Sequence, residues 1–104
     1  MEINNNIKGK RLLNAKEICI YTGLGRDRAR EFMEEIGDAM KYASMADSAS
    51  GHERQVLLDM AHDEHTHAKH ICHMLKDHGL PIEGHKEQLQ KAMDAIEEIR
   101  HHFH

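Results

Sequence analysis

Residues 52–78 of the chain, HERQVLLDMAHDEHTHAKHICHMLKDH, decide the fold. Apolar side chains recur along this stretch at steps of three and four residues, a pattern typical of the buried face of a long α-helix. The same steps also pass through one carboxylate and one imidazole, at Glu64 and His67. The full series is Leu57, Met60, Glu64, His67, Ile71 and Met74. Because an unpaired carboxylate in an apolar core costs several kcal/mol, we expect this one to be paired or bound to a cation.

A second long helix precedes this stretch and is predicted over about 27–49, where Ser50 interrupts it. Its apolar steps contain a single carboxylate, at Glu35. The full series is Phe32, Glu35, Ala39, Tyr42 and Ala46. We therefore expect Glu35, Glu64 and His67 to face one another in the core of a helical bundle.

Two further helices flank this pair. Asn14 followed by Glu17 is a capping box that predicts a short helix over 15–21, ended by Gly23. Gly79, Pro81 and Gly84 mark the next connection, and from there a third long helix is predicted to run to the end of the chain. Its apolar steps contain one imidazole, and the series is Ile82, His85, Leu89, Ala92, Ile96, Ile99 and Phe103.

The composition predicts an all-α fold in one domain of 104 residues. The chain has one Val, two Thr and no Trp, so strand formers are scarce. We divide it into a basic helical cap (1–30), an antiparallel helical hairpin (31–78) and a C-terminal helix (79–104). Leu, Ile, Val and Phe make up only 20 of the 104 residues, so the core is thin and association of copies is expected.

The charge is unevenly distributed and the chain lacks membrane and disulfide signals. The net charge of −4 divides into +4 for residues 1–30 and −8 for residues 31–104. No apolar run approaches the roughly 20 residues of a membrane span, and the first residues have no secretory pattern, so we expect a cytoplasmic protein without membrane contact. Cys19 and Cys72 are far apart and predict neither a disulfide framework nor a cysteine zinc site.

The Glu-x-x-His motif at Glu64 and His67 presents an oxygen and a nitrogen ligand on one face of a helix. Carboxylate-bridged di-iron bundles use six ligands, four carboxylates and two imidazoles, and this motif together with Glu35 supplies three of the six. Two copies about a twofold axis would supply all six, which predicts a homodimer or a larger assembly. The second such motif, at Glu98 and His101, lies beside the apolar series and is expected at the surface. The alternative is a polar layer that fixes helix register without binding metal.

The sequences EIGDAMKYA (35–43) and DEHTH (63–67) resemble the ferritin-like superfamily, in its rubrerythrin-type branch. The resemblance covers about 31–75, and the spacing between the motifs is also similar to that of short two-helix encapsulated ferritins. It implies a four-helix bundle completed by dimerisation. It also implies a di-iron site that oxidises ferrous iron with oxygen or peroxide, with manganese or zinc as alternative metals.

Position by position, the resemblance implies that Glu35, Glu64 and His67 are metal ligands and that Tyr42 is a neighbour of the site. The sequence departs from the rubrerythrin pattern, because the apolar series contain no second ligand set of one Glu and one Glu-x-x-His, and the rubredoxin-like cysteines are missing. The C-terminus also does not look like an encapsulin-targeting peptide. Glu31 and Glu34 compete for the role of helix ligand, but we expect them on a solvated acidic face.

Five further histidines of the 52–78 stretch are expected on a solvated helix face. These residues are His62, His65, His70, His73 and His78. Their spacing also permits zinc, nickel or copper binding at the surface, which makes a plain helical dimer that buffers metals a further function class. Cys72 is expected to fill a small space in the core.

The N-terminal segment carries a competing resemblance. Residues 11–35 look like a helix-turn-helix of the excisionase type, in which the second helix enters the major groove of DNA. The resemblance implies that Arg26, Arg28 and Arg30 meet DNA phosphates at the start of that helix. The β-hairpin wing of that family does not follow, and the acidic remainder of the chain would repel DNA. The alternative is a solvated basic face on a structural cap.

Overall fold

The computed structural model describes residues 12–103, and all regular structure within them is helical. The helices are α2 (Ala15–Thr22), α3 (Arg26–Ser48), α4 (Gly51–Asp77) and α5 (Glu83–Phe103). The predicted all-α class is therefore confirmed, and the predicted helix ends lie within one or two residues of the observed ones. In the described part of the chain, no helix is both long and apolar enough to cross a bilayer.

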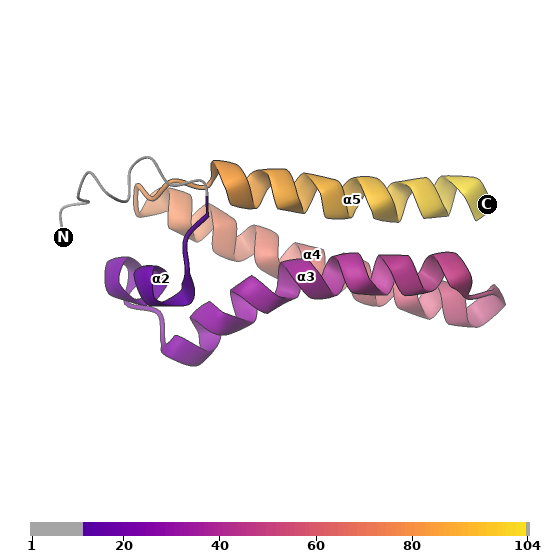
Figure 1. The fold of residues 1–104 in the computed structure, drawn as a ribbon, viewed down its shortest axis with the longest axis horizontal. Coiled ribbons are helices and arrows are strands. Elements are labelled where there is room, and N and C mark those ends of the chain that lie inside the picture. The colour runs from indigo at the N-terminus through magenta and orange to yellow at the C-terminus, as the bar shows by residue number, and fades with distance from the viewer. Residues whose placement is uncertain (1–11, 104) are drawn as a thin grey trace.

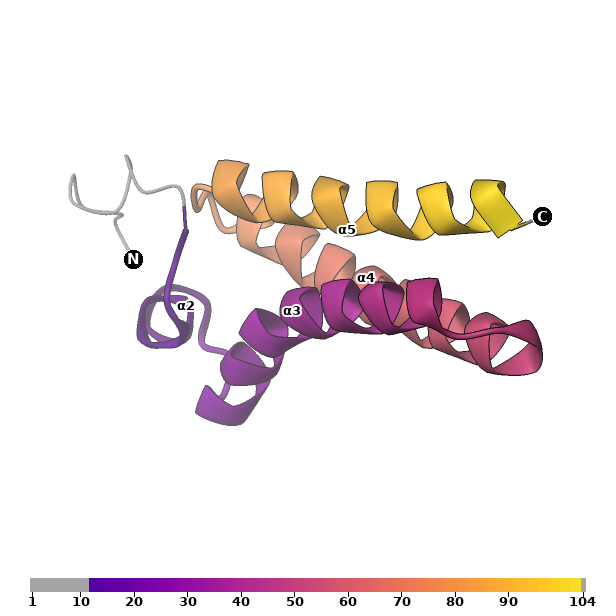
Figure 2. The same ribbon diagram turned by 45° about the vertical axis from the view of Figure 1, so that its right-hand side comes forward.

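The three long helices run side by side in an elongated molecule with extents of 50 × 23 × 17 Å. α3 packs mainly against α4, and α5 lies along both of them (Figures 1 and 2). The short helix α2 packs against α3 at the end of the molecule opposite the C-terminus. α4 therefore has two helical neighbours, which determines which of its side chains are buried.

The boundaries of α2 follow from local chemistry. The side chain of Asn14 accepts a hydrogen bond from the backbone N–H of Glu17 (2.8 Å), and the Glu17 carboxylate accepts one from the backbone N–H of Asn14 (3.0 Å). This is the predicted capping box, in which two otherwise unpaired donors are satisfied. Gly23 ends the helix with a φ of 77°, a left-handed conformation that a side chain would strain.

The core consists of two apolar clusters along the bundle. The proximal cluster, at the α2 end, contains large fully buried side chains such as Phe32, Ile18 and Leu75. The distal cluster, near the connection of α3 to α4, contains more small residues, and its members are Ala43, Ala46, Leu57, Leu58, Ala61, Ile96 and Ile99. In the sequence of α4, Glu64 falls between Ala61 of the distal cluster and Ala68 of the proximal one, whereas Glu35 of α3 falls within the proximal cluster.

The predicted apolar series hold for α3 and α5 but not for the whole of α4. On α3 every member is buried except the half-buried Tyr42, and on α5 only Phe103 is exposed. On α4 the predicted burial is wrong at two positions, because Met60 and His67 are exposed in the single chain. Glu64 is half-buried. The buried face of α4 is instead formed by Leu57, Leu58, Ala61, His65, Ala68, Ile71, Cys72 and Leu75. Because α4 packs against both α3 and α5, this face is wider than a single stripe and is turned toward α5.

Candidate metal centre

Glu35 of α3 and Glu64 and His67 of α4 lie together on the flank where the two helices meet. Each side chain offers one ligand atom, and these three atoms lie within 4.8 Å of one another. The three-residue spacing of Glu64 and His67 places both on one side of α4, and close packing of α3 brings Glu35 to them. Within the described residues this is the group of three or more potential ligands close enough to hold a metal ion.

The carboxylate of Glu35 is buried and only half satisfied. Its Oε1 accepts a hydrogen bond of 2.7 Å from Nη1 of Arg28, two turns earlier on α3. Its Oε2 is buried and has no hydrogen-bond partner among the residues that the structure describes. Since buried carboxylate oxygens are costly when unpaired, this atom is suited to receive a cation.

Arg28 is shared between two carboxylates. The same Nη1 lies 3.2 Å from Oε2 of Glu31, which is exposed. The hydrogen bond to Glu35 is the main reason that the pKa of Arg28 is raised, and Glu31 adds to the effect. Arg28 therefore supplies the positive charge that offsets Glu35 in the absence of a metal ion.

Glu64, the second carboxylate of the group, is surrounded by other carboxylates. Partial burial, and then the charge of Glu35, raise the pKa of Glu64, and Asp38 and Asp63 raise it further. His67 acts in the opposite direction. The ionised form of Glu64 is thus disfavoured until a positive charge arrives, as expected for a cation site.

The other predicted site residues lie outside this group. Tyr42 is half-buried and packs against the distal cluster, and its role beside the ligands remains a prediction. Glu31 and Glu34 are exposed, as expected for a solvated face. Glu98 and His101 are also exposed, which confirms that the second Glu-x-x-His motif is at the surface.

The prediction that these histidines of α4 lie on a solvated face is correct in part. His70, His73 and His78 are exposed and His62 is half-buried. His65 is buried instead, because it lies on the side of α4 that α5 covers, where burial lowers its pKa. Cys72 is buried, as predicted for a small core residue.

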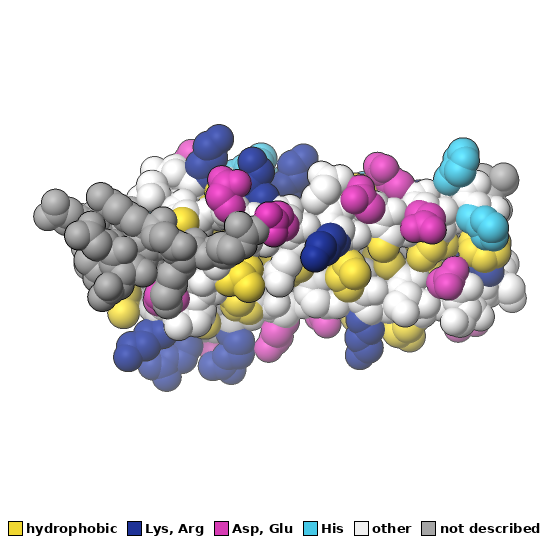
Figure 3. Space-filling view, turned by 45° about the horizontal axis from the view of Figure 1, so that its top comes forward, with side chains coloured by type: hydrophobic (Ala, Val, Ile, Leu, Met, Phe, Trp, Pro, Cys, Tyr) yellow, Lys and Arg dark blue, Asp and Glu magenta, His cyan; other side chains and the backbone are white. Residues whose placement is uncertain are grey.

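The three arginines at the start of α3 differ in their surroundings. Figure 3 shows Lys and Arg side chains gathered at the end of the molecule where α3 begins. Arg26 and Arg30 are exposed, and Arg30 lies 3.8 Å from Asp27. Arg28 is turned toward Glu35, so its charge is already engaged. The sequence reasoning missed this role, although a spacing of seven residues places Arg28 and Glu35 on one face of a helix.

Comparison of the chain with models of known protein families, with curated proteins and with solved structures found no match.

Proposed function

We propose that the chain is a ferritin-like metal-binding protein that holds two irons between two copies and oxidises ferrous iron with oxygen or peroxide. The observation that carries this proposal is the convergence of Glu35, Glu64 and His67 from two helices to within 4.8 Å. The resemblance of residues 31–75 to ferritin-like proteins supports the choice of metal and reaction.

The chemistry of the three side chains fits a divalent cation of intermediate hardness. Carboxylate oxygen together with imidazole nitrogen suits iron, with manganese or zinc as alternatives. The free Oε2 of Glu35 and the raised pKa of Glu64 are both relieved when a cation binds. Metal binding is then expected to release any proton held by Glu64 and to weaken the hold of Arg28 on Glu35.

A second copy is the partner that the site requires. One chain provides two carboxylates and one imidazole, half of the set in a carboxylate-bridged two-metal bundle. His67 and Met60 are exposed on this flank of α4, and Val56, one turn before Met60, is exposed as well. α5 covers a different side of α4, marked by His65. Packing a second copy here would bury the apolar side chains and bring the two half sites together.

The proposed reaction requires two electrons, one from each ferrous ion. Hydrogen peroxide accepts both, together with two protons, and gives two water molecules. Molecular oxygen accepts the same two electrons and two protons and gives hydrogen peroxide. Bound iron supplies this redox chemistry, and the role of the chain is to hold two ions with Glu35, Glu64 and His67 from each copy.

The test measures iron retained after size exclusion under anaerobic ferrous loading. We expect about one iron per chain in a species of two or more copies. The double variant Glu64→Ala with His67→Ala should lose this iron. The matched control, Glu98→Ala with His101→Ala, removes the same residue types at the same spacing from the surface of α5 and should retain it.

Two results would contradict the proposal. Equal iron in both double variants would show binding elsewhere, for example at the exposed histidines. A monomer that retains iron would contradict the shared site. If no protein retains iron, salt-sensitive binding to duplex DNA would test the helix-turn-helix alternative, with Arg26→Ala and Arg30→Ala as the variants that should weaken it.

A further inference from the structure

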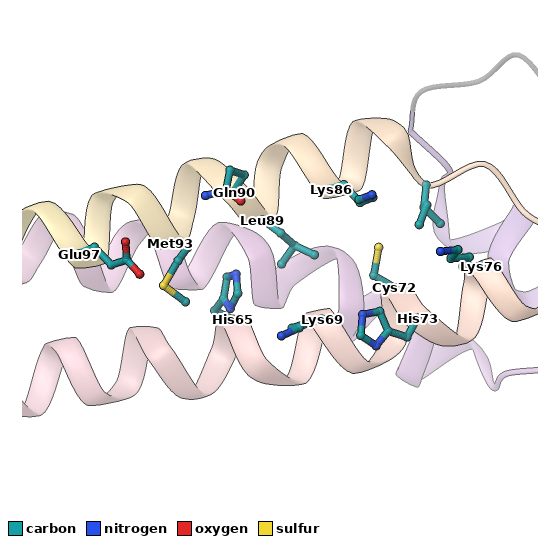
Figure 4. Close-up of a pocket in the computed structure, with 11 residues that line it drawn as sticks. His65, Lys69, Cys72, His73, Lys76, Lys86, Leu89, Gln90, Met93 and Glu97 are labelled. Carbon is teal, nitrogen blue, oxygen red and sulfur yellow. The ribbon is translucent and has the colours of Figure 1, made fainter.

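A groove of about 390 Å³ runs between α4 and α5, on a different side of α4 from Glu64 and His67. Its volume is within the range of small-molecule sites in proteins. Figure 4 shows Lys69 and Lys76 coming from α4 and Lys86 from α5, with His73 beside them. Two helices therefore direct basic side chains into one concave surface.

The positive charge of this groove contrasts with the acidic character of residues 31–104. Residues 31–104 carry a net charge of −8 and contain five lysines, and three of the five line this groove. Within residues 12–103, none of these three ammonium groups forms an ion pair. Glu97 also lines the groove, but it lies at the opposite end from Lys76 (Figure 4). The three lysines are exposed, and among the described residues the carboxylates nearest the groove, Glu83 and Glu97, form no ion pair with them.

The floor of the groove is apolar. Ile82 and Leu89 are buried members of the proximal cluster, and Met93 continues this surface toward Glu97. Cys72 also lies in the groove, and burial raises the pKa of its thiol, while the nearby Lys86 ammonium opposes that rise. A neutral thiol and three apolar side chains would favour the organic part of a ligand.

We propose that this groove binds a small organic phosphate, with Lys69, Lys76 and Lys86 around the phosphate group and the organic part on Ile82, Leu89 and Met93. Lysine binds phosphate as a point charge with three donors, and three ammonium groups more than offset the double negative charge of a phosphate monoester. A metal cation is disfavoured here by the same charges. Cys72 and His73 also do not belong to a group of three ligand atoms close enough for a metal in the described residues.

The test is a titration of the full chain, followed by backbone amide chemical shifts. Phenyl phosphate is the probe. Inorganic phosphate and phenol, which represent its charged and apolar parts, are the controls. We expect phenyl phosphate to shift amides between residues 69 and 93 and to bind more tightly than inorganic phosphate, while phenol shifts none of them. Binding should weaken as NaCl is raised to 0.5 M, because exposed charges are screened.

Matched variants separate the groove from general charge. Lys76→Ala with Lys86→Ala should weaken phenyl phosphate binding about tenfold, because two of the three ammonium groups around the phosphate are removed and each exposed charge contributes modestly. The control, Lys41→Ala with Lys91→Ala, removes the same charge from exposed lysines outside the groove and should leave binding unchanged. Circular dichroism establishes that both variants remain helical.

Three results would overturn this inference. They are equal weakening in both double variants, shifts by phenol as large as those by phenyl phosphate, and an absence of shifts near the groove. The inference is independent of the proposed metal centre, because the probes contain no metal and both variants retain Glu35, Glu64 and His67. Loss of iron in the earlier experiment would therefore leave this result unaffected.

Discussion

Arg28 binds the carboxylate that α3 contributes to the metal ligands, with its Nη1 2.7 Å from Oε1 of Glu35. The same guanidinium also contacts Glu31, one turn closer on the helix, at 3.2 Å. A cation that binds Glu35 must compete with Arg28, and Glu31 offers the guanidinium an exposed alternative partner. The strength of metal binding is therefore expected to depend on a residue that is not itself a ligand.

Replacement of Arg28 by Ala should lower the stability of the metal-free chain and raise its affinity for a metal ion. Without the guanidinium, Glu35 loses its hydrogen-bond donor, and unfolding of the metal-free protein should become easier by about 1 kcal/mol, since the pair is partly exposed. The metal no longer has a competitor, so the rise in melting temperature on adding ferrous iron should be larger than in the wild type. Calorimetry under anaerobic conditions measures both quantities. Arg30→Ala is the control. Arg30 is exposed and its guanidinium lies 3.8 Å from the carboxylate of Asp27, so its removal should change neither the stability nor the metal-induced rise in melting temperature.

Glu64→Gln is expected to stabilise the metal-free protein while it abolishes metal binding. Burial and the charge of Glu35 raise the pKa of Glu64, so the ionised form present at neutral pH is unfavourable in the folded state. A neutral amide of the same shape removes this repulsion, and we expect a gain of a few tenths to about 1 kcal/mol. Urea unfolding at pH 7 with a chelator gives the free energy, and iron analysis gives the binding. A loss of both stability and iron would indicate a structural role for this carboxylate.

The stability of the chain should fall as the pH is lowered below about 6.5, because of His85. This imidazole is fully buried, its Nε2 accepts a hydrogen bond of 2.9 Å from the backbone N–H of Leu13, and burial lowers its pKa from 6.5. The unfolded chain takes up a proton near pH 6.5, whereas the folded chain resists it. Each such histidine therefore costs up to about 1.4 kcal/mol of stability per pH unit below that value. The buried His65 acts in the same direction, and Glu64, with its raised pKa, acts in the opposite one.

Urea unfolding between pH 7.5 and 5 measures this dependence. His85→Gln retains an acceptor for the N–H of Leu13 but cannot take up a proton. Its free energy of unfolding should therefore decline less steeply with acidification than that of the wild type. Equal slopes in the two proteins would show that His85 titrates alike in the folded and unfolded states.

Met60→Lys should weaken association between copies without unfolding the helices. Met60 is 39% exposed on the flank that carries the ligands, where the proposed second copy would bury it. A buried unpaired ammonium is costly, so sedimentation equilibrium should show more monomer. Met40→Lys is the control, because Met40 is equally exposed, at 40%, but lines a hollow between α3 and α5. Equal effects of the two substitutions would contradict the proposed face.

The helices could be predicted because their limits are encoded locally. Asn14 and Glu17 form the capping box seen in the structure, and Gly23 and Gly79 adopt positive φ angles at the predicted breaks. The convergence of Glu35, Glu64 and His67 was also predictable, because periodicity places each of them in the apolar series of its helix, although the core position expected for His67 was wrong. Such features depend on residues a few positions apart, and the sequence displays them directly.

The features that were not predicted depend on tertiary packing. The exposed position of His67 and the buried position of His65 follow from α5 covering one side of α4, and the periodicity of α4 alone does not reveal how many neighbours the helix has. Arg28 was expected either to meet DNA phosphates, as the helix-turn-helix resemblance implies, or to lie on a solvated basic face. Its engagement with Glu35 depends on how the guanidinium is directed along α3, and several directions are compatible with the same sequence.

The unequal character of the two apolar clusters implies an order of opening along the bundle. The distal cluster relies on Ala43, Ala46 and Ala61, which remove less apolar surface from water than Phe32 and Leu75 of the proximal cluster. Amide hydrogens at the connection of α3 to α4 should therefore exchange with solvent before those around the proximal cluster. Glu64 lies at the boundary between the two clusters and Glu35 within the proximal one, so a bound ion would hold α4 against α3 at the point where the less stable half of the hairpin begins.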